Sequence, residues 1–156
     1  MRTIGIDPGK TGAIALYADG DIVALHDMPM DGDTVDAPAL YYLIGSMIYQ
    51  MIFIERVELR PRQSGVINMV ANYGRILGIA ELLTPGRVRT VSSQRWQSPL
   101  LLPKERKEKL AAYTAMAAQM WPWHEWYGPR GGLRDGRAAA ALIARHGAEV
   151  LEADDA

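Results

Sequence analysis

The stretch that decides the fold is "TIGIDPGKTGAIAL", residues 3–16, in which two apolar runs surround a single carboxylate. Asp7 ends the first run, Pro8 and Gly9 follow at once, and the second run begins at Ala13. Burying an unpaired carboxylate costs free energy. Asp7 therefore either caps the turn that follows it or stands at a strand end to meet a cationic group.

The surrounding sequence predicts three strands, over residues 2–7, 12–18 and 21–28. The last two are joined through Asp19-Gly20, a dipeptide typical of the tight hairpin turn in which both central residues have positive φ. We therefore expect an antiparallel meander at the start of the chain.

The rest of the chain alternates between helical and strand patterns. Three meandering strands followed by this alternation indicate an α/β fold, with a five-stranded mixed sheet of antiparallel and parallel strands flanked by helices. We expect one domain over residues 1–150 and a frayed acidic tail over 151–156. The other expected elements are a loop at 30–38, a helix capped by Asp36, a strand ending in Glu55, helices at 64–83 and 103–121, a strand at 87–93, a loop at 122–132 and a helix at 134–147 closed by Gly147.

The helix expected at 64–83 carries Gly74 and Gly78 one turn apart. Each glycine costs up to about 1 kcal/mol relative to alanine, which close approach of another backbone would explain. The apolar set of this helix is broader than one stripe. It therefore predicts either an interface between two copies of the chain or burial between the sheet and a neighbouring helix.

Composition bounds the classes of function. The chain has 156 residues and no cysteine, which excludes disulfides and thiolate metal sites. No uninterrupted apolar run of about 18 residues and no basic leader are visible, so we expect a cytoplasmic protein without a membrane partner. Residues 1–57 have a charge balance of −5, residues 58–110 of +6 and the remainder of −2. A basic middle can face a polyanion, although a solvated charged surface is an equal alternative.

Three acids share positions at element ends: Asp7 and Glu55 end strands, and Asp135 begins a helix. If the two strands are parallel neighbours, their carboxylates emerge at one sheet edge, and a helix packed on that sheet could add Asp135. Converging carboxylates repel one another, and a divalent cation removes the repulsion. Taken singly, each has another explanation: a turn residue, an ion pair with Arg56, or a helix N-terminal acid.

Order and motifs together resemble the RNase H-like nucleases, and more narrowly the RuvC-type Holliday junction resolvases, including their small bacteriophage versions. The motifs that carry this resemblance are "GIDPGKTG" at 5–12, "IFIERV" at 52–57, "GRILG" at 74–78 and "DGRAAAALIARHG" at 135–147. The resemblance covers nearly the whole chain. It implies an RNase H-like fold.

The resemblance also implies a function: hydrolysis of phosphodiester bonds in four-way DNA junctions, with two Mg²⁺ or Mn²⁺ ions per active site and a 5′ phosphate product. Asp7, Glu55 and Asp135 are then the catalytic metal ligands, with Asp7 bridging the ions. Because a four-way junction has two-fold symmetry and needs paired incisions, a homodimer is expected.

One departure from the family pattern concerns a fourth acid on the last helix, three or four residues after the third. Ala138 and Ala139 occupy those positions here, and we assign the missing acid to Ala139. Either a natural variant works with three acids, or alanine has replaced the fourth and left a protein that binds DNA but barely cuts it.

The basic middle supplies candidate DNA contacts. In the family, the region after the second acid faces the junction and can carry an aromatic wedge. Glu58 stands at that place here, and Leu59 is a possible substitute. A solvated helix face is the alternative for the later lysines. The candidate DNA-binding residues are Lys10, Arg56, Leu59, Arg60, Arg62, Lys104, Arg106, Lys107 and Lys109.

Trp121, Trp123 and Trp126 cluster in the loop expected at 122–132 and its edge, and Trp96 follows the fifth strand. Stacking on an unpaired base is conceivable, but core packing is the favoured reading. We expect Trp96 to pack beneath the fifth strand.

Two rival functions remain open from sequence. One is an RNase H-like nuclease acting on RNA–DNA hybrids or flaps, which would use the same acids. The other is a junction-binding module without catalysis, which Ala138 and Ala139 suggest. An Hsp70-like nucleotide binder is disfavoured because those proteins are longer and duplicate the fold.

Overall fold

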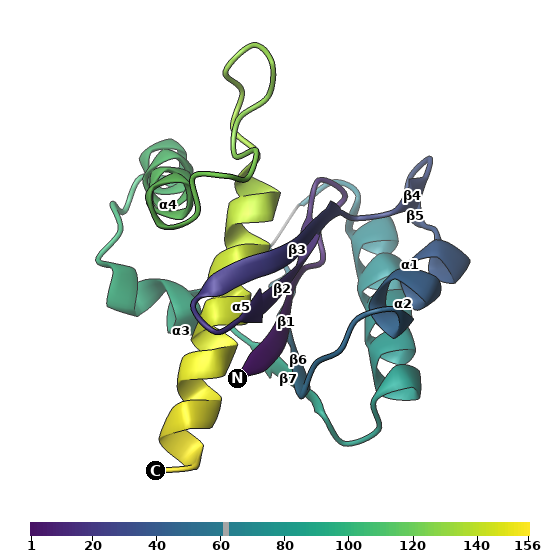
Figure 1. Cartoon of the computed structure of the whole chain (residues 1–156). Coiled ribbons are helices and arrows are strands. Elements are labelled where there is room, and N and C mark those ends of the chain that lie inside the picture. Colours follow the sequence, from purple (N-terminus) through teal and green to yellow (C-terminus); the bar gives the residue numbers. More distant parts are fainter. Residues whose placement is uncertain (61–62) are drawn as a thin grey trace.

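A five-stranded mixed sheet forms the centre of the computed structural model, which describes residues 1–60 and 63–156 (Figure 1). The strand order is β3-β2-β1-β6-β7, antiparallel among the first three and parallel from β1 to β7. This confirms the predicted fold class. The strands of this sheet are β1 (Arg2–Asp7), β2 (Ala13–Ala18), β3 (Asp21–Asp27), β6 (Met51–Glu55) and β7 (Val88–Val91).

The turn between β2 and β3 has the expected conformation, because Asp19 has φ of 52° and Gly20 has φ of 94°. Aspartate and glycine tolerate this left-handed region, which most side chains avoid. The hairpin therefore confirms a prediction made from two residues alone.

One face of the sheet is covered by α1 (Ala37–Gly45) and α2 (Val66–Leu83) (Figure 1). Helix α1 begins as expected, since the Asp36 carboxylate accepts a hydrogen bond of 3.0 Å from the Ala39 N–H. Alternation along the strands sends every second side chain to this face. The fully buried core there comprises Ile4, Ile6, Ile14, Leu40, Ile44, Ile52, Ile54, Ile76 and Ala80.

The opposite face carries α5 (Asp135–Asp154), which crosses the sheet with α3 (Ser93–Gln97) and α4 (Arg106–Met120) beside it (Figure 1). The buried Thr3 hydroxyl donates a 2.6 Å hydrogen bond to the Ala144 carbonyl, tying β1 to the helix. A short 3₁₀ turn at Ser98–Leu100 follows α3.

Glycines let α5 lie in direct contact with the sheet. A Cβ at Gly5 would stand 2.2 Å from the Ala140 carbonyl oxygen, and one at Gly147 would stand 2.3 Å from the Phe53 ring. Neither distance is available to a real side chain. Residues 138–141 of this helix are all alanines and all buried.

Substituting alanine for Gly5 should therefore destabilise the fold by about 3 kcal/mol, the upper end of the usual cost of overpacking, because the obstacle is helix backbone that cannot move aside. The matched variant Gly132→Ala, in the loop before α5, has nothing within 4 Å of the new Cβ. It should be neutral or stabilise the protein by up to about 1 kcal/mol. Urea unfolding of both variants measures the difference, and equal midpoints would contradict the close contact.

The loop expected at 30–38 contains a two-stranded hairpin, β4 (Met30–Asp31) and β5 (Thr34–Val35). A residue distant in sequence stabilises it: the buried Asn72 side chain accepts from the Val35 N–H at 2.9 Å and donates to the Asp33 carbonyl at 2.8 Å. These tertiary bonds have no local sequence signal.

Several predicted boundaries were wrong. Gly147 lies inside α5 rather than at its end, and the helix continues through Asp154, so residues 151–154 are not a frayed tail. Helix α4 begins only at Arg106, where Glu105 caps it by accepting from the Glu108 N–H, so Lys104 precedes the helix. The strand expected at 87–93 ends at Val91, and the short helix α3 already begins at Ser93.

Gly74 and Gly78 of α2 lie on an open surface. A Cβ at either would meet nothing within 4 Å, so no backbone among residues 1–60 and 63–156 approaches them, and close approach by a second copy of the chain stays a prediction. By length and composition α2 would qualify as a membrane-spanning helix, which corrects the expectation that no segment does. One such helix is weak evidence, and α2 packs on the sheet through Ile76 and Ala80.

Trp121 and Trp126 are buried, as the core-packing reading predicts, whereas Trp123 is 62 % exposed. Trp96 lies in α3 and is buried in the core on the α5 face. His124 contacts the Ile22 carbonyl at 2.7 Å through Nε2, which ties this loop to β3.

Candidate active site

Asp7 and Glu55 lie side by side at the carboxyl ends of neighbouring parallel strands. The register pairs Ile6 of β1 with Ile54 of β6, and the two acids are the next residues in each strand. Successive side chains of a strand point to opposite faces of the sheet. Ile6 and Ile54 face α1 and α2, so the next residues, Asp7 and Glu55, point to the α5 face. The geometric condition for bringing these carboxylates together is therefore met.

The turn after β1 answers the question raised by Asp7. One carboxylate oxygen accepts a hydrogen bond of 3.2 Å from the Gly9 N–H, and the Gly12 N–H donates to the Gly9 carbonyl at 2.8 Å. A Cβ at Gly12 would stand 2.0 Å from the Asp7 carbonyl oxygen, so only glycine permits this fold-back. Asp7 thus caps the turn with one oxygen and leaves the other unbonded to described residues.

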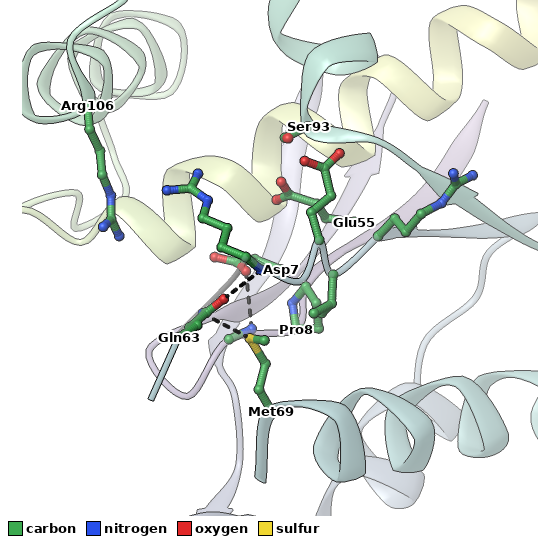
Figure 2. Close-up of a pocket in the computed structure, with 12 residues that line it drawn as sticks. Asp7, Pro8, Glu55, Gln63, Met69, Ser93 and Arg106 are labelled. Atoms are coloured by element: carbon green, nitrogen blue, oxygen red, sulfur yellow. Dashed lines mark hydrogen bonds between the residues drawn. The ribbon is translucent and has the colours of Figure 1, made fainter. Parts of the chain in front are cut away.

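A cavity of about 530 Å³ opens at this edge of the sheet, and Figure 2 shows the side chains around it. Besides Asp7 and Glu55, the loop after β6 and residues of α2, α3 and α4 line this cavity. The lining residues are Asp7, Pro8, Gly9, Glu55, Arg56, Val57, Glu58, Arg60, Gln63, Met69, Ser93 and Arg106.

Asp135 stands at the first residue of α5, next to this cavity but lining a neighbouring one of about 440 Å³. The adjoining Gly136 fixes its place, since a Cβ there would stand 2.0 Å from the Thr11 carbonyl oxygen. The start of α5 therefore rests on the turn that follows Asp7. Asp135 is near enough to contribute to the raised pKa of Asp7.

The two strand-end acids have strongly raised pKa values. Burial, opposed by the Gly9 hydrogen bond and reinforced by Asp135, raises the pKa of Asp7 to about 6. Burial and then the charge of Asp7 raise the pKa of Glu55 to about 7. Among the described residues, no Lys, Arg or His forms an ion pair with Asp7, Glu55 or Asp135. A site with excess, uncompensated oxygen charge fits a hard divalent cation.

The buried Tyr113 of α4 records the same crowding. Its pKa is raised first by burial and then by the charges of Asp135, Asp7 and Glu55, in that order. All three carboxylates therefore lie within electrostatic reach of one side chain. They do not, however, form a ready cluster of three ligands within the described residues, and the three-acid cation site stays a prediction.

Because both folded-state pKa values exceed the ordinary values of 3.8 and 4.5, the native protein binds more protons than the unfolded chain between about pH 4 and 7. Stability without metal should therefore fall as pH rises through this window, by roughly 4–6 kcal/mol in total at about 1.4 kcal/mol per pKa unit. Urea unfolding in EDTA at several pH values measures it. In Asp7→Asn the fall should be about half as large, because burial still raises the pKa of Glu55, and identical profiles for the two proteins would contradict the assignment.

The predicted DNA-binding residues divide into groups. Arg56, Arg60 and Arg106 line the acidic cavity, whereas Lys104 and Lys109 line a separate hollow of about 310 Å³. Lys107 and Leu59 are exposed, Leu59 at 59 %.

Lys10 lines the Asp135 cavity and forms an ion pair with Asp33. Arg62 lies outside the described residues.

Two arginines that the sequence reading overlooked lie beside Asp135. Arg134 and Arg137 line its cavity, and Arg137 is held by Asp27 through bonds of 2.6 and 2.9 Å. Their position next to Asp135 in the sequence was a signal that could have identified them. Ser93 and Gln63 had no such signal, because the short helix α3 and the loop conformation bring them to the cavity.

Ala138 and Ala139 are 0 % and 3 % exposed and belong to the core around Phe53, Trp96 and Tyr113. Neither residue offers an oxygen ligand. An acid at either position would lie about one turn beyond Asp135 on α5 and would be buried. Burial raises the pKa of a carboxyl group.

No family model matches the sequence, and no curated protein matches it significantly. Solved structures do match. T. thermophilus RuvC in complex with a Holliday junction substrate superposes with a TM-score of 0.66 at 14 % identity, covering 98 % of this chain and 96 % of that one. A second Thermus thermophilus RuvC structure gives 0.58 at 15 % identity, with 96 % of each chain covered. The fold that the sequence motifs imply is thereby confirmed: this chain has the fold of RuvC.

Proposed function

We propose that the chain is an endonuclease that cleaves four-way DNA junctions by divalent-cation-dependent hydrolysis. The observation that carries this proposal is the cavity in which Asp7 and Glu55, at adjacent strand ends, face a rim of arginines. Paired carboxylates suit a cation, and the arginines suit the phosphates of a polyanion. The acidic floor and basic rim are the two halves of a phosphodiester site.

The chain's own residues have distinct tasks in this proposal. Asp7 and Glu55 are the primary cation ligands, and Asp135 adds a third carboxylate from α5. The Gly9 N–H holds one oxygen of Asp7 and thereby fixes the direction of the other. When bound, Mg²⁺ or Mn²⁺, in the two-ion arrangement implied by the family resemblance, would supply Lewis acidity and activate water for attack that leaves a 5′ phosphate.

The arginines around the cavity are assigned to the DNA backbone. Arg56 and Arg60 come from the loop after β6. Arg106, which Figure 2 labels, is the first residue of α4. They therefore approach the acids from two separate elements. Each phosphate contact contributes affinity that declines with salt, without reading sequence.

Branched DNA is the proposed substrate because the RuvC structure with matching fold is a complex with a Holliday junction substrate. The test is a panel of labelled substrates with Mg²⁺ or Mn²⁺: a four-way junction, a flap, an RNA–DNA hybrid and a plain duplex. Symmetric incision of the junction supports the proposal. Preferential cleavage of the hybrid or flap would replace it with the rival nuclease function.

Junction binding without catalysis is the second candidate, favoured by the buried alanines at positions 138 and 139. Tight junction binding with no incision under either cation is its expected result. This candidate also requires that no incision appears after an acid is introduced on α5.

We further propose a homodimer through the outer face of α2. Ile67 is 84 % exposed, Val70 44 % and Leu82 72 %, and the open Gly74 and Gly78 lie between them on the same stripe. Small residues flanked by large apolar ones allow two helices to approach closely. This interface accounts for the glycine pair, which no neighbouring segment of the described residues approaches.

Ile67→Glu combined with Leu82→Glu should convert a dimer into a monomer, because burying each apolar side chain contributes about 1.5–3 kcal/mol. Sedimentation equilibrium measures the mass, and urea unfolding confirms the fold. The control is Val23→Glu, a 50 % exposed apolar residue on β3, which should leave the mass unchanged. A wild-type protein that is monomeric at micromolar concentration would contradict the interface.

A further inference from the structure

The four tryptophans of the chain differ in one respect. Trp121 donates its indole N–H to the Gly20 carbonyl at 3.1 Å, Trp123 to Asp21 at 3.2 Å, and Trp126 to the Trp121 carbonyl at 2.7 Å. Trp96 is 3 % exposed, yet its Nε1 has no hydrogen-bond partner, alone among the buried side-chain nitrogens and oxygens of residues 1–60 and 63–156. A buried donor left unpaired costs about 1–3 kcal/mol, so its retention calls for a reason.

The surroundings of this indole lead to Glu55. Glu55 pairs with Val91 across the sheet, and the Arg56 N–H donates to the Val91 carbonyl at 2.7 Å. Ser92 then caps α3, so the helix that carries Trp96 starts beside the carboxylate. Burial and then Asp7 raise the pKa of Glu55, while the Trp96 indole acts in the opposite direction, as a donor facing the carboxylate does.

The indole is also held in place from behind. Its ring packs edge-on against Tyr113 with centroids 5.6 Å apart and an interplanar angle of 65°. Both rings belong to the core that includes Ala139. The ring is therefore fixed on one side, and Ser93, one turn earlier on the same face of α3, lines the cavity together with Glu55.

We propose that Trp96 is a positioning residue, whose buried indole N–H donates to one oxygen of Glu55 and directs the other oxygen into the cavity shared with Asp7. This inference rests on the proposed function, since it makes Trp96 the outer support of a cation ligand. Carboxylate ligands are commonly oriented by such hydrogen bonds, and their loss costs 10–100-fold in metal affinity or activity. No contact with DNA or with the reacting atoms is assigned to Trp96.

The first test is independent of catalysis. In ¹H–¹⁵N spectra of the full chain, the four indole N–H signals serve as probes, and Trp96 is assigned by its loss in Trp96→Phe. If that variant does not fold, the signal is assigned by elimination with Trp121→Phe, Trp123→Phe and Trp126→Phe. Glu55→Gln should shift the Trp96 signal upfield and leave the other three in place. An unmoved Trp96 signal overturns the proposal.

The second test measures Mn²⁺ affinity by calorimetry. Trp96→Phe should weaken binding at least about tenfold, whereas Trp121→Phe, an equally buried change at the opposite end of the sheet, should leave it unaltered. Equal loss in both variants, or none in Trp96→Phe, overturns the positioning role. If wild-type protein binds no Mn²⁺, the proposed function fails, and so does Trp96 as support for a cation ligand, even where the spectra show its contact with Glu55.

Discussion

Asp7→Asn should reduce cleavage of a four-way junction by at least about a thousandfold. The substitution keeps the size and the turn-capping oxygen but removes the charge that holds a cation, a loss of several kcal/mol at about 1.4 kcal/mol per tenfold. Junction affinity should be retained or rise slightly, because the carboxylate repels phosphates. Single-turnover incision and gel-shift titration measure the two effects separately.

The control for this variant is Asp155→Asn, the same chemical change at an exposed residue beyond the far end of α5. It should cleave like the unsubstituted protein. If that protein is inactive, both substitutions are compared in the Ala139→Asp background. Cleavage by Asp7→Asn within tenfold of its parent would remove Asp7 from the active site.

Ala139→Asp should raise junction cleavage at least about a hundredfold if the fourth acid of the family pattern has been lost at this position. The gain follows from a further oxygen ligand on the helix turn after Asp135, worth a few kcal/mol in the transition state. The same change should destabilise the metal-free protein by about 1–3 kcal/mol, since residue 139 is 3 % exposed. The incision rate measures the gain in cleavage, and urea unfolding measures the loss of stability.

Ala138→Asp is the matched comparison, because residue 138 is equally buried and one position away. A gain at 138 but not at 139 would move the missing acid by one residue. No gain at either position would leave a natural three-acid enzyme or a junction-binding module, which the substrate panel distinguishes.

The sheet and the pair of strand-end acids could be predicted because their signals are local. Alternating apolar residues, the Asp19-Gly20 turn and the position of Glu55 at the end of an apolar run are properties of a few adjacent residues. The parallel pairing of β1 with β6 then brings Asp7 and Glu55 together. Nothing beyond strand order was needed for this part of the site.

Elements stabilised by distant contacts escaped prediction. The β4–β5 hairpin depends on Asn72, and Gly147 reads as a helix end although it marks where α5 passes the Phe53 ring. Glycine in a helix has two physical meanings, termination and close approach, and only the packed structure distinguishes them.

The place of Asp135 was harder to predict than that of the other acids, because a helix can lie at many heights on a sheet. Contacts at Gly5, Gly136 and Gly147 set that height here, and they place Asp135 at the edge of a neighbouring cavity. The same packing places Arg134 and Arg137 at that cavity.

The contact between Gly136 and the Thr11 carbonyl has a consequence for motion. The β1–β2 turn and the first turn of α5 are in direct backbone contact, with no side chain between them. Displacement of one segment should therefore displace the other. The two segments should accordingly exchange their amide hydrogens as a single cooperative unit. A ligand that binds to the turn should thereby also restrict the motion of the Asp135 carboxylate, more than 120 residues further along the chain.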